Sequence, residues 1–190
     1  YFAFSSRGSA VTLLTMQMIR SNQPMQTETI IMAQEAVNDW WEVEALYDLC
    51  FAPGRTALSS YRLRDEIEPI APLCLTARDG EGILAGAIRY WPVKVGGAPV
   101  ALLGPVAVHP TRQGEGLAAM LLHRSLASAR KRDWDRVLLV GDLPYYGRFG
   151  FAQIEGVEMP PPTNPDRILA LSLRTGAWDS VRGDVEKWTD

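Results

Sequence analysis

The most informative stretch of this chain is VAVHPTRQGEGLAAMLLHRSLASARKR, residues 106–132. It begins as an apolar run, continues through Gly114 and Gly116, and ends in a helical pattern. Glycine costs a helix about 1 kcal/mol relative to alanine, so two glycines at a helix start need a reason. The first turn of a helix has N–H groups without intrahelical partners and carries partial positive charge. Because glycine has no Cβ, an anion can approach these groups, and the stretch predicts a phosphate cradle directly after a strand.

The helix that follows has a clear apolar face, and this face predicts burial against a sheet. Its members are Leu117, Ala118, Leu121, Leu122, Ser125 and Ala129. His123 lies opposite their centre, so we expect it in solvent and assign it no catalytic role. A glycine-containing loop before a helix is also common in α/β proteins. Neither G-x-x-x-x-G-K-[ST] nor a complete dinucleotide fingerprint occurs, which argues against ATP hydrolysis and dinucleotide binding.

Size and charge bound the class of protein. With 190 residues, 47% of them hydrophobic, the chain is long enough for one compact domain. Its 19 Lys and Arg against 22 Asp and Glu give a net charge of -3, and no basic segment suits a nucleic-acid partner. Cys50 and Cys74 form no C-x-x-C motif and have no histidine cluster beside them. We therefore predict no metal site, no disulfide framework and a reduced, cytoplasmic protein.

The N-terminal segment AVTLLTMQMI, residues 10–19, is the one candidate for targeting. It is too short and too polar to span a bilayer, so no membrane anchor is predicted. The chain begins at Tyr1, and Met25 would be a natural start for the domain. Residues 1–27 are therefore expected to be an N-terminal extension without an assigned role.

The first half of the remaining chain reads as a strand and two helices. TETIIMAQ, residues 27–34, predicts a short strand, and residues 53–69 predict a loop and a short helix. Between them, residues 38–51 predict a helix capped by Asn38 or Asp39. The residues expected on its buried face are Trp41, Ala45, Leu46 and Leu49.

Three strands joined by tight glycine-containing turns come next, and they predict an antiparallel meander. They are PLCLTAR (72–78), ILAGAIRYWPV (83–93) and VALLGPVAVHP (100–110). After the helix, further strands are predicted in residues 136–142, 152–159 and 167–173, and a turn with a last strand in residues 174–190. Trp178, Val181 and Trp188 are expected to be packing residues there. This order of strands and helices is typical of a layered α/β sheet.

Two segments together resemble the GNAT superfamily of acetyl-CoA-dependent N-acetyltransferases. Residues 113–118, QGEGLA, resemble the family's Q/R-x-x-G-x-G/A signature and follow VAVHP as that signature follows the fourth strand. In YYGRFGF, Tyr146, Gly150 and Phe151 resemble the Y-x-x-x-G-F segment after the fifth strand. The resemblance implies a GNAT-like α/β fold with a mixed, largely antiparallel sheet of six or seven strands flanked by helices. It also implies that residues 28–190 form a single N-acetyltransferase domain.

The resemblance assigns a coenzyme site. It implies that amides of residues 114–118 hold the pyrophosphate of acetyl-CoA, and that the strand edge at residues 106–108 pairs with the pantetheine arm. The implied binding residues are Val106, Ala107, Val108, Gln113, Gly114, Glu115, Gly116, Leu117 and Ala118. One departure concerns Glu115, because the family often has a basic residue between the glycines. Its carboxylate would lie near the pyrophosphate unless the side chain points away.

Acyl transfer to an amine needs a neutral nucleophile, oxyanion stabilisation and protonation of the departing thiolate. Tyr146 suits the last task, since the matching tyrosine of the family lies beside the coenzyme sulfur. A packing role is the alternative for Tyr146, although neighbouring Tyr145 suits that role better. A backbone N–H near Val108 would polarise the carbonyl. The general base is left open among Glu66, Glu68 and Asp142, and both cysteines are expected to be buried thiols instead of nucleophiles.

These inferences predict acetyl transfer from acetyl-CoA to a primary amine by direct attack in a ternary complex. The alternative is a non-catalytic acyl-CoA-binding or regulatory module of the same fold, which an occluded acceptor mouth would favour. Acetylation of a protein or a charged tRNA would need a basic or open groove, for which the composition gives no sign. The expected partner is a small-molecule or peptide amine, with no nucleic acid and no membrane, and a homodimer is left open.

Overall fold

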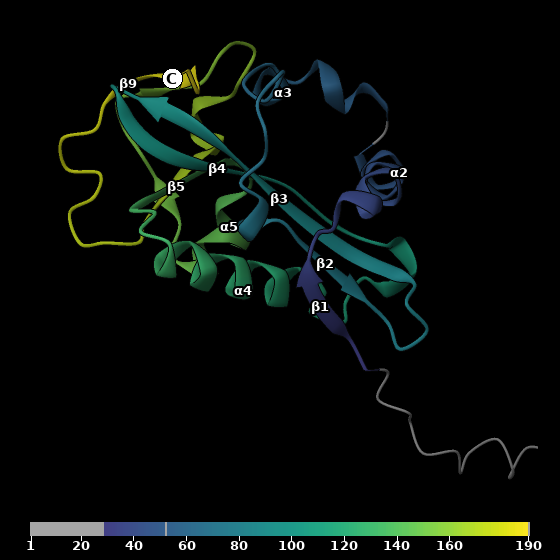
Figure 1. The fold of residues 1–190 in the computed structure, drawn as a ribbon. Coiled ribbons are helices and arrows are strands. Elements are labelled where there is room, and N and C mark those ends of the chain that lie inside the picture. The colour runs from purple at the N-terminus through teal and green to yellow at the C-terminus, as the bar shows by residue number, and fades with distance from the viewer. Residues whose placement is uncertain (1–28, 52, 190) are drawn as a thin grey trace, which may run out of the picture.

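The structure is a computed structural model that describes residues 29–51 and 53–189 (Figure 1). The predictions for residues 1–27 lie outside this range. The strands are β1 (Ile31–Gln34), β2 (Leu75–Arg78), β3 (Leu84–Val95), β4 (Ala98–Val108), β5 (Arg136–Val140), β6 (Ala152–Gln153), β7 (Val157–Glu158), β8 (Ile168–Ser172) and β9 (Gly183–Lys187). The helices are α2 (Trp40–Phe51), α3 (Ser59–Arg62), α4 (Leu117–Lys131) and α5 (Leu143–Tyr146). Short 3-10 turns occupy residues 37–39, 53–57, 71–73, 110–112, 147–149 and 165–167.

One mixed sheet runs through the molecule in the order β1-β2-β3-β4-β5-β8-β6. Strands β1 to β4 pair antiparallel in sequence order, as the predicted meander requires. The β4–β5 pair is parallel, and β8 returns antiparallel to β5 and β6. β9 pairs antiparallel with β3 and parallel with the short β7. The predicted fold class, a largely antiparallel sheet flanked by helices, is confirmed.

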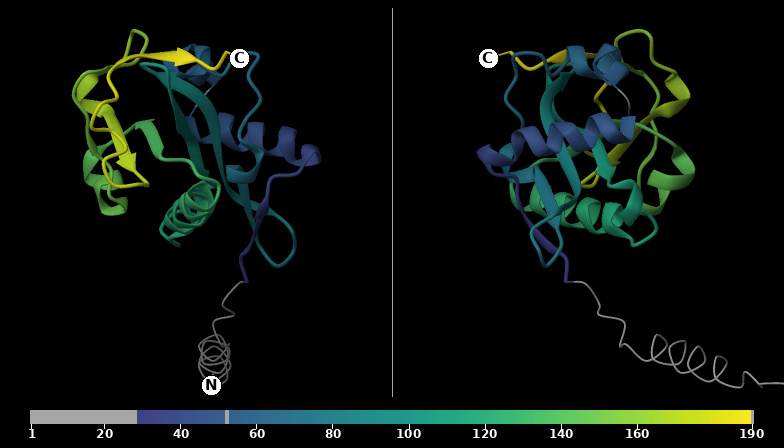
Figure 2. Two further views of the ribbon diagram at one scale, coloured as in Figure 1. Left: turned by 60° about the vertical axis from the view of Figure 1, so that its left-hand side comes forward. Right: turned by 90° about the vertical axis from the view of Figure 1, so that its right-hand side faces the viewer.

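Helices α2 and α4 cover opposite faces of the long β3–β4 hairpin (Figure 2). The α4 side of the sheet holds the larger apolar cluster, which includes Ile88 and Tyr90 of β3. The α2 side holds a smaller one, which includes Ala87 of β3 and Ala107 of β4. Since successive residues of a strand point to opposite faces, β3 contributes to both layers.

The predicted face of α4 is buried as expected. Leu117, Leu121 and Leu122 are at most 2% exposed. Ser125 is fully buried and lies 2.8 Å from the hydroxyl of Tyr90, and this hydrogen bond joins the helix to β3 inside the core. His123 is exposed, as predicted. The start of α4 is therefore held in a fixed place relative to β4.

The predicted face of α2 is wrong in part. The structure buries Val43, Leu46 and Tyr47, while Trp41 is 81% exposed. Of the four residues expected inside, only Leu46 is buried; Trp41, Ala45 and Leu49 are exposed. Apolar residues occur on every side of this helix, so periodicity alone did not select the face. A polar contact selects the face instead. Glu44, on the inner side of the helix, forms an ion pair with the buried Arg89 of β3.

The C-terminal segment packs on the sheet. Trp178 is 8% exposed and donates its indole N–H to the carbonyl of Leu171 at 3.2 Å, so it has the predicted packing role. Val181 is buried as well. The predicted last strand is present as β9, but none of the three named residues lies in it: Trp178 and Val181 precede β9, and Trp188 follows it. In the described part of the chain, no helix is long and apolar enough to cross a membrane.

Candidate active site

The parallel pair β4–β5 separates along its length and forms a fork. Its register contains only Ala101 opposite Val137 and Leu102 opposite Leu138. Beyond Leu102, β4 continues to Val108 with β3 as its only strand partner among the described strands. A cavity of about 160 Å³ occupies this fork. Its lining from the sheet and α5 comprises Leu102, Leu103, Gly104, Pro105, Val106, Leu139, Val140 and Tyr146.

The β4 edge of the fork presents backbone donors. The N–H of His109 donates to Ala85 of the β3 side at 2.9 Å. Because residues of an antiparallel ladder alternate between the two sides, Val108 and Val106 direct their N–H groups away from β3, into the fork. Ala107 between them pairs with Ala87 of β3 and is buried. Two of the three residues predicted to meet the pantetheine arm therefore face the fork.

The two glycines before α4 have the backbone conformation that glycine favours. Gly114 has φ +88° and Gly116 has φ +81°, both in the left-handed region. A Cβ at either position would meet nothing within 4 Å, so conformation is the constraint and the space beside the turn is open. Met120 donates the first intrahelical bond, to the carbonyl of Gly116 at 3.1 Å. The amides of residues 117–119 therefore have no partner within the helix.

Glu115, the departure from the family pattern, is neutralised by a neighbour. Its carboxylate accepts from Nε of Arg112 at 2.8 and 3.0 Å. Arg112 also lies 3.5 Å from Asp79 in the β2–β3 turn, and both of these side chains are 16% exposed. The ion pair draws Glu115 toward that turn and lowers the negative charge beside the cradle.

Tyr146 ends α5 and lines the fork cavity from the β5 side. Its ring packs edge-on against Tyr145 and Phe151, with centroid distances of 5.0 and 5.9 Å. Burial raises the pKa of Tyr146 to about 12, and the nearby Tyr145 and Asp142 add to this while Arg167 opposes it. The phenol is therefore a proton donor across the physiological pH range. The structure places Tyr146 and Val106 in the wall of one cavity.

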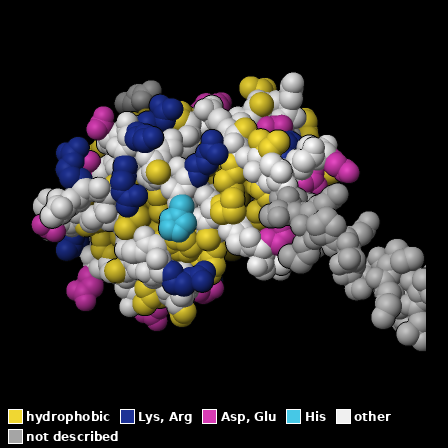
Figure 3. Space-filling view, turned by 90° about the horizontal axis from the view of Figure 1, so that it is seen from below, with side chains coloured by type: hydrophobic (Ala, Val, Ile, Leu, Met, Phe, Trp, Pro, Cys, Tyr) yellow, Lys and Arg dark blue, Asp and Glu magenta, His cyan; other side chains and the backbone are white. Residues whose placement is uncertain are grey.

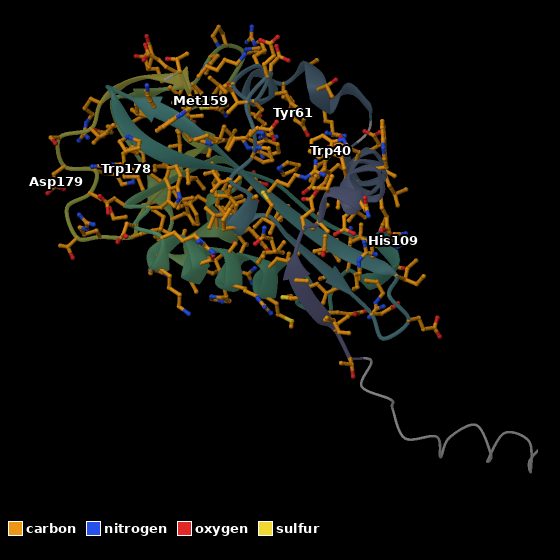
Figure 4. The ribbon with its side chains drawn as sticks, viewed as in Figure 1. Trp40, Tyr61, His109, Met159, Trp178 and Asp179 are labelled. Carbon is orange, nitrogen blue, oxygen red and sulfur yellow. The ribbon has the colours of Figure 1, made fainter. Side chains whose placement is uncertain are left out.

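A second, larger cavity of about 820 Å³ adjoins the fork on the α2 and α3 side. The two cavities share four wall residues, namely Arg55, Tyr61, Arg64 and Pro105. Figure 4 shows Trp40 and Tyr61 on this side of the sheet, away from Trp178. Glu66 and Glu68, two of the proposed bases, line the larger cavity. Asp142, the third, lines neither of the two and pairs with Arg167 at 3.1 Å.

A network of charges forms one wall of the larger cavity. Arg89 is 1% exposed, and its guanidinium bonds to Glu35 at 2.6 and 2.8 Å and to Glu44. Arg55 donates hydrogen bonds to the other carboxylate oxygen of Glu44 at 2.5 Å and to Asp48 at 2.9 Å. Both oxygens of Glu44 therefore accept hydrogen bonds from arginines. The network escaped sequence reasoning because its members are up to 54 positions apart.

Arg64 stands apart from these paired arginines. Its guanidinium lies between the rings of Tyr61 and Trp91, 4.4 and 4.6 Å from their centroids. Nε and Nη1 are buried and have no hydrogen-bond partner among the described residues. Burial lowers the pKa of Arg64 to about 10, while Tyr61 and Tyr47 oppose the shift. No sequence signal marked this residue.

Both thiols lie outside the cavity walls described above. Cys74 is 3% exposed, and burial raises its pKa to about 12. Cys50 is only half-buried, so the prediction of a buried thiol is wrong for this residue. Partial burial still raises its pKa, against the opposing effect of the hydrogen bond from its Sγ to the carbonyl of Val108 at 3.4 Å. Because the thiolate is the nucleophilic form, neither cysteine is activated in this structure.

Comparison with known proteins identifies similar chains. Residues 34–154 match a family model described as an acetyltransferase (GNAT) domain. The N-acetyltransferase YhbS of Escherichia coli strain K12 is 32% identical over 148 residues, which cover 76% of this chain and 87% of that protein. The crystal structure of Escherichia coli YhbS in complex with CoA superposes with a TM-score of 0.75 at 26% identity, covering 87% of this chain and 93% of that one. A GNAT family acetyltransferase from Brucella melitensis in complex with acetyl-CoA gives a TM-score of 0.64 at 27% identity, with coverages of 85% and 97%.

Proposed function

Because this chain belongs to the GNAT family of acetyltransferases, we propose that it moves the acetyl group of acetyl-CoA to a primary amine by direct attack in a ternary complex. The family, the enzyme class and acetyl-CoA as cosubstrate, which the sequence predicted, are confirmed. The finer proposal concerns the mechanism, the residues and the acceptor.

The observation that carries it is the shared wall of the two cavities. Tyr146 and the β4 edge line the fork cavity, and the larger cavity adjoins it, with Arg64 and Pro105 in the walls of both. An amine bound in the larger cavity could therefore reach an acetyl group in the fork without a covalent enzyme intermediate. The raised pKa values of Cys50 and Cys74 also favour direct attack over a ping-pong route.

The turn before α4 fits a pyrophosphate. The open space beside Gly114 and Gly116 and the unpaired amides of residues 117–119 offer donors at a helix N-terminus. Exposed basic side chains gather over the α4 side of the molecule (Figure 3), and Arg124, Arg130, Lys131 and Arg132 are among the exposed residues there. We assign coenzyme binding to Val106, Ala107, Val108, Gln113, Gly114, Glu115, Gly116, Leu117 and Ala118.

The bound coenzyme supplies an activated thioester carbonyl. The N–H of Val106 or Val108 donates to the carbonyl oxygen as negative charge develops on it. Tyr146 donates to the departing sulfur. Because the pKa of Tyr146 is about 12 and that of an ordinary thiol is about 8.5, a strong hydrogen bond contributes more than complete proton transfer. Glu66 and Glu68 remain the proposed bases, acting through water from the wall of the larger cavity.

The alternative is a non-catalytic acyl-CoA-binding or regulatory module of the same fold. A cavity of about 820 Å³, where an acceptor could bind, adjoins the fork cavity and favours the enzyme. Asp65, Glu66 and Glu68 in its wall would attract a cationic amine. A cytoplasmic location and a homodimer also remain predictions. For the dimer, the exposed apolar side chains Val37, Trp41 and Leu49 offer a surface, and sedimentation would measure the mass.

Two measurements test the proposal together. Acetyl-CoA, and desulfo-CoA almost equally, should raise the melting temperature, because a ligand selective for the folded state stabilises it. A thiol-release assay over a panel of amines should then identify an acceptor. Stabilisation by acetyl-CoA without thiol release from any amine would favour the regulatory module. No stabilisation and no binding heat would contradict the coenzyme site.

A further inference from the structure

We propose that the acceptor is a free α-amino acid, and that Arg64 binds the carboxylate next to the amine that is acetylated. This inference rests on the proposed function and specifies the acceptor class for the same site. Among the arginines that line the larger cavity, Arg64 differs from Arg55 and Arg89 in having no ion-pair partner among the described residues.

The two buried arginines of this cavity already have anionic partners. Arg55 bonds to Glu44 and Asp48, and Arg89 bonds to Glu35 and Glu44. Their charges are therefore balanced within the protein. A buried guanidinium normally needs such partners, because removing an unpaired charge from water is strongly unfavourable.

Arg64 lacks this balance. Its Nε and Nη1 are buried and unpaired among the described residues, and no salt bridge to Arg64 occurs among them. The guanidinium carbon lies over the rings of both Tyr61 and Trp91, 4.4 and 4.6 Å from their centroids. These contacts and a hydrogen bond with Tyr61 leave the N–H groups of Nε and Nη1 without acceptors in the described part of the chain. A guanidinium has two edges that match a planar carboxylate, Nε with Nη2 and Nη1 with Nη2, and each edge contains one of these two unpaired nitrogens and offers two parallel hydrogen bonds.

The position of Arg64 limits where the carboxylate can lie on the acceptor. Arg64 lines both the fork cavity, which holds Tyr146, and the larger cavity. A carboxylate bound there would lie where the two cavities adjoin. In an α-amino acid, one carbon separates the carboxylate from the amine. The amine can then reach into the fork while the amino-acid side chain remains in the larger cavity.

The rest of the larger cavity suits such a ligand. Its volume of about 820 Å³ exceeds the size of any common amino acid, and the rings of Trp40, Tyr47 and Trp91 provide apolar surface for a side chain. Asp65, Glu66 and Glu68 would attract the ammonium form before it loses its proton. The N-terminus of a peptide has an amide in place of the carboxylate, so the site should discriminate against it.

The test compares each of the twenty standard L-amino acids with its own carboxamide. Thiol release at saturating acetyl-CoA gives kcat/KM for both compounds. The amine of the carboxamide is less basic than that of the free acid, so more of it is in the neutral, nucleophilic form. Without any contact to the carboxylate, the carboxamide should therefore react faster. We expect at least one free acid to be preferred over its amide by tenfold or more, which needs a binding contribution from the carboxylate.

Variants then identify Arg64 as the origin of the preference. Arg64→Gln should lower kcat/KM for the acid to the level of its amide while leaving the amide nearly unchanged, and Arg64→Lys should retain part of the preference. Arg174→Gln is the matched control and should retain the full preference, because the Arg174 side chain is 66% exposed and lines neither cavity. The stabilisation by acetyl-CoA should persist in all three variants, which shows that each is folded and binds coenzyme.

The possible results distinguish failure of the inference about Arg64 from failure of the proposed acetyltransferase function. Amides acetylated as well as acids, or an undiminished preference in Arg64→Gln, would overturn the inference and leave the acetyltransferase proposal standing. Thiol release with neither acids nor amides would also overturn it, and loss of acetyl-CoA binding in the wild-type protein would overturn the proposed function as well.

Discussion

The ring of Tyr146 lies directly against the backbone of Gly141. A Cβ at position 141 would stand 2.4 Å from Cε2 and 2.7 Å from Cδ2 of that ring, closer than real Cβ atoms approach a neighbour. Gly141 directly follows β5, and its amide donates to the carbonyl of Arg167 at 2.9 Å, which fixes the backbone there. The ring would therefore have to move, together with Cδ1 of Leu139, which the same Cβ would approach to 2.9 Å.

Gly141→Ala should displace the phenol of Tyr146 from the fork while the coenzyme cradle stays intact. We expect kcat to fall by about tenfold to a hundredfold, because a displacement near 1 Å can have that effect on a reacting group. Calorimetry should show little change in acetyl-CoA affinity. Gly80→Ala is the control, since a Cβ there meets nothing within 4 Å, and its kcat should equal that of the wild type. Equal turnover in both variants would contradict the role of the ring.

Tyr146→Phe keeps the ring and removes the donor. Turnover at saturating substrates should fall by about tenfold to a thousandfold, the range of general acid catalysis, with acetyl-CoA affinity nearly unchanged. Tyr145→Phe, which alters the adjacent ring, should retain wild-type turnover. A purely packing role for Tyr146 predicts the opposite: intact turnover and at most about 1 kcal/mol lost from the free energy of unfolding.

The cradle can be tested by a pair of glycines with matched backbone strain. Gly116 has φ +81° and Gly97, in the β3–β4 turn, has φ +79°, and a Cβ at either meets nothing within 4 Å. Gly116→Glu should abolish acetyl-CoA binding, because it adds bulk and negative charge where the pyrophosphate is proposed to lie. Gly97→Glu should have a melting temperature similar to that of Gly116→Glu, and it should bind acetyl-CoA as tightly as the wild-type protein. Normal affinity in a folded Gly116→Glu protein would place the cradle elsewhere.

The Arg112–Glu115 ion pair should matter for coenzyme affinity. Arg112→Gln leaves the Glu115 carboxylate without this cation beside the cradle, and we expect acetyl-CoA to bind about threefold to tenfold more weakly at low salt. The double variant Arg112→Gln/Glu115→Gln should recover the loss, and high salt should reduce the difference. If the double variant binds as weakly as Arg112→Gln, Arg112 itself holds the ligand.

Stability should decrease at alkaline pH. The pKa of Cys74 is raised by burial to about 12, whereas the thiol ionises near 9 when unfolded, so between these values the unfolded chain binds fewer protons than the folded one. The free energy of unfolding should then fall by about 1.4 kcal/mol per pH unit from this group alone. Urea unfolding at pH 8 to 11 measures the slope, and Cys74→Ala should make it shallower by that amount. Identical slopes would show that the thiol ionises alike in both states.

The sequence predicted the parts of this fold that local chemistry determines. The glycine-containing turns between residues 72 and 110 specify a meander, and the apolar spacing of α4 specifies its buried face. The face of α2 was mispredicted because Glu44 pairs with Arg89, 45 positions away in the chain. Periodicity describes a helix alone and contains no information about a buried charge on another element.

In the candidate site too, residues marked by local motifs were predicted, and residues that depend on contacts distant in the sequence were not. Residues 113–118 and Tyr146 were proposed because short motifs mark them, and Tyr146 lies in the wall of the fork cavity. Arg64 and Gly141 were missed. Each matters through a neighbour in space, Tyr61 and Trp91 for the first and the ring of Tyr146 for the second, and neither has a spacing that reveals this.

The early separation of β5 from β4 also bears on how the empty protein behaves in concentrated solution. A strand edge with unsatisfied N–H groups is a template onto which another extended segment can add, and such edges promote aggregation. A ligand that hydrogen-bonds along residues 106–108 would occupy this template in the way a missing strand would. Protein purified with coenzyme present should therefore tolerate storage at high concentration better than protein freed of it.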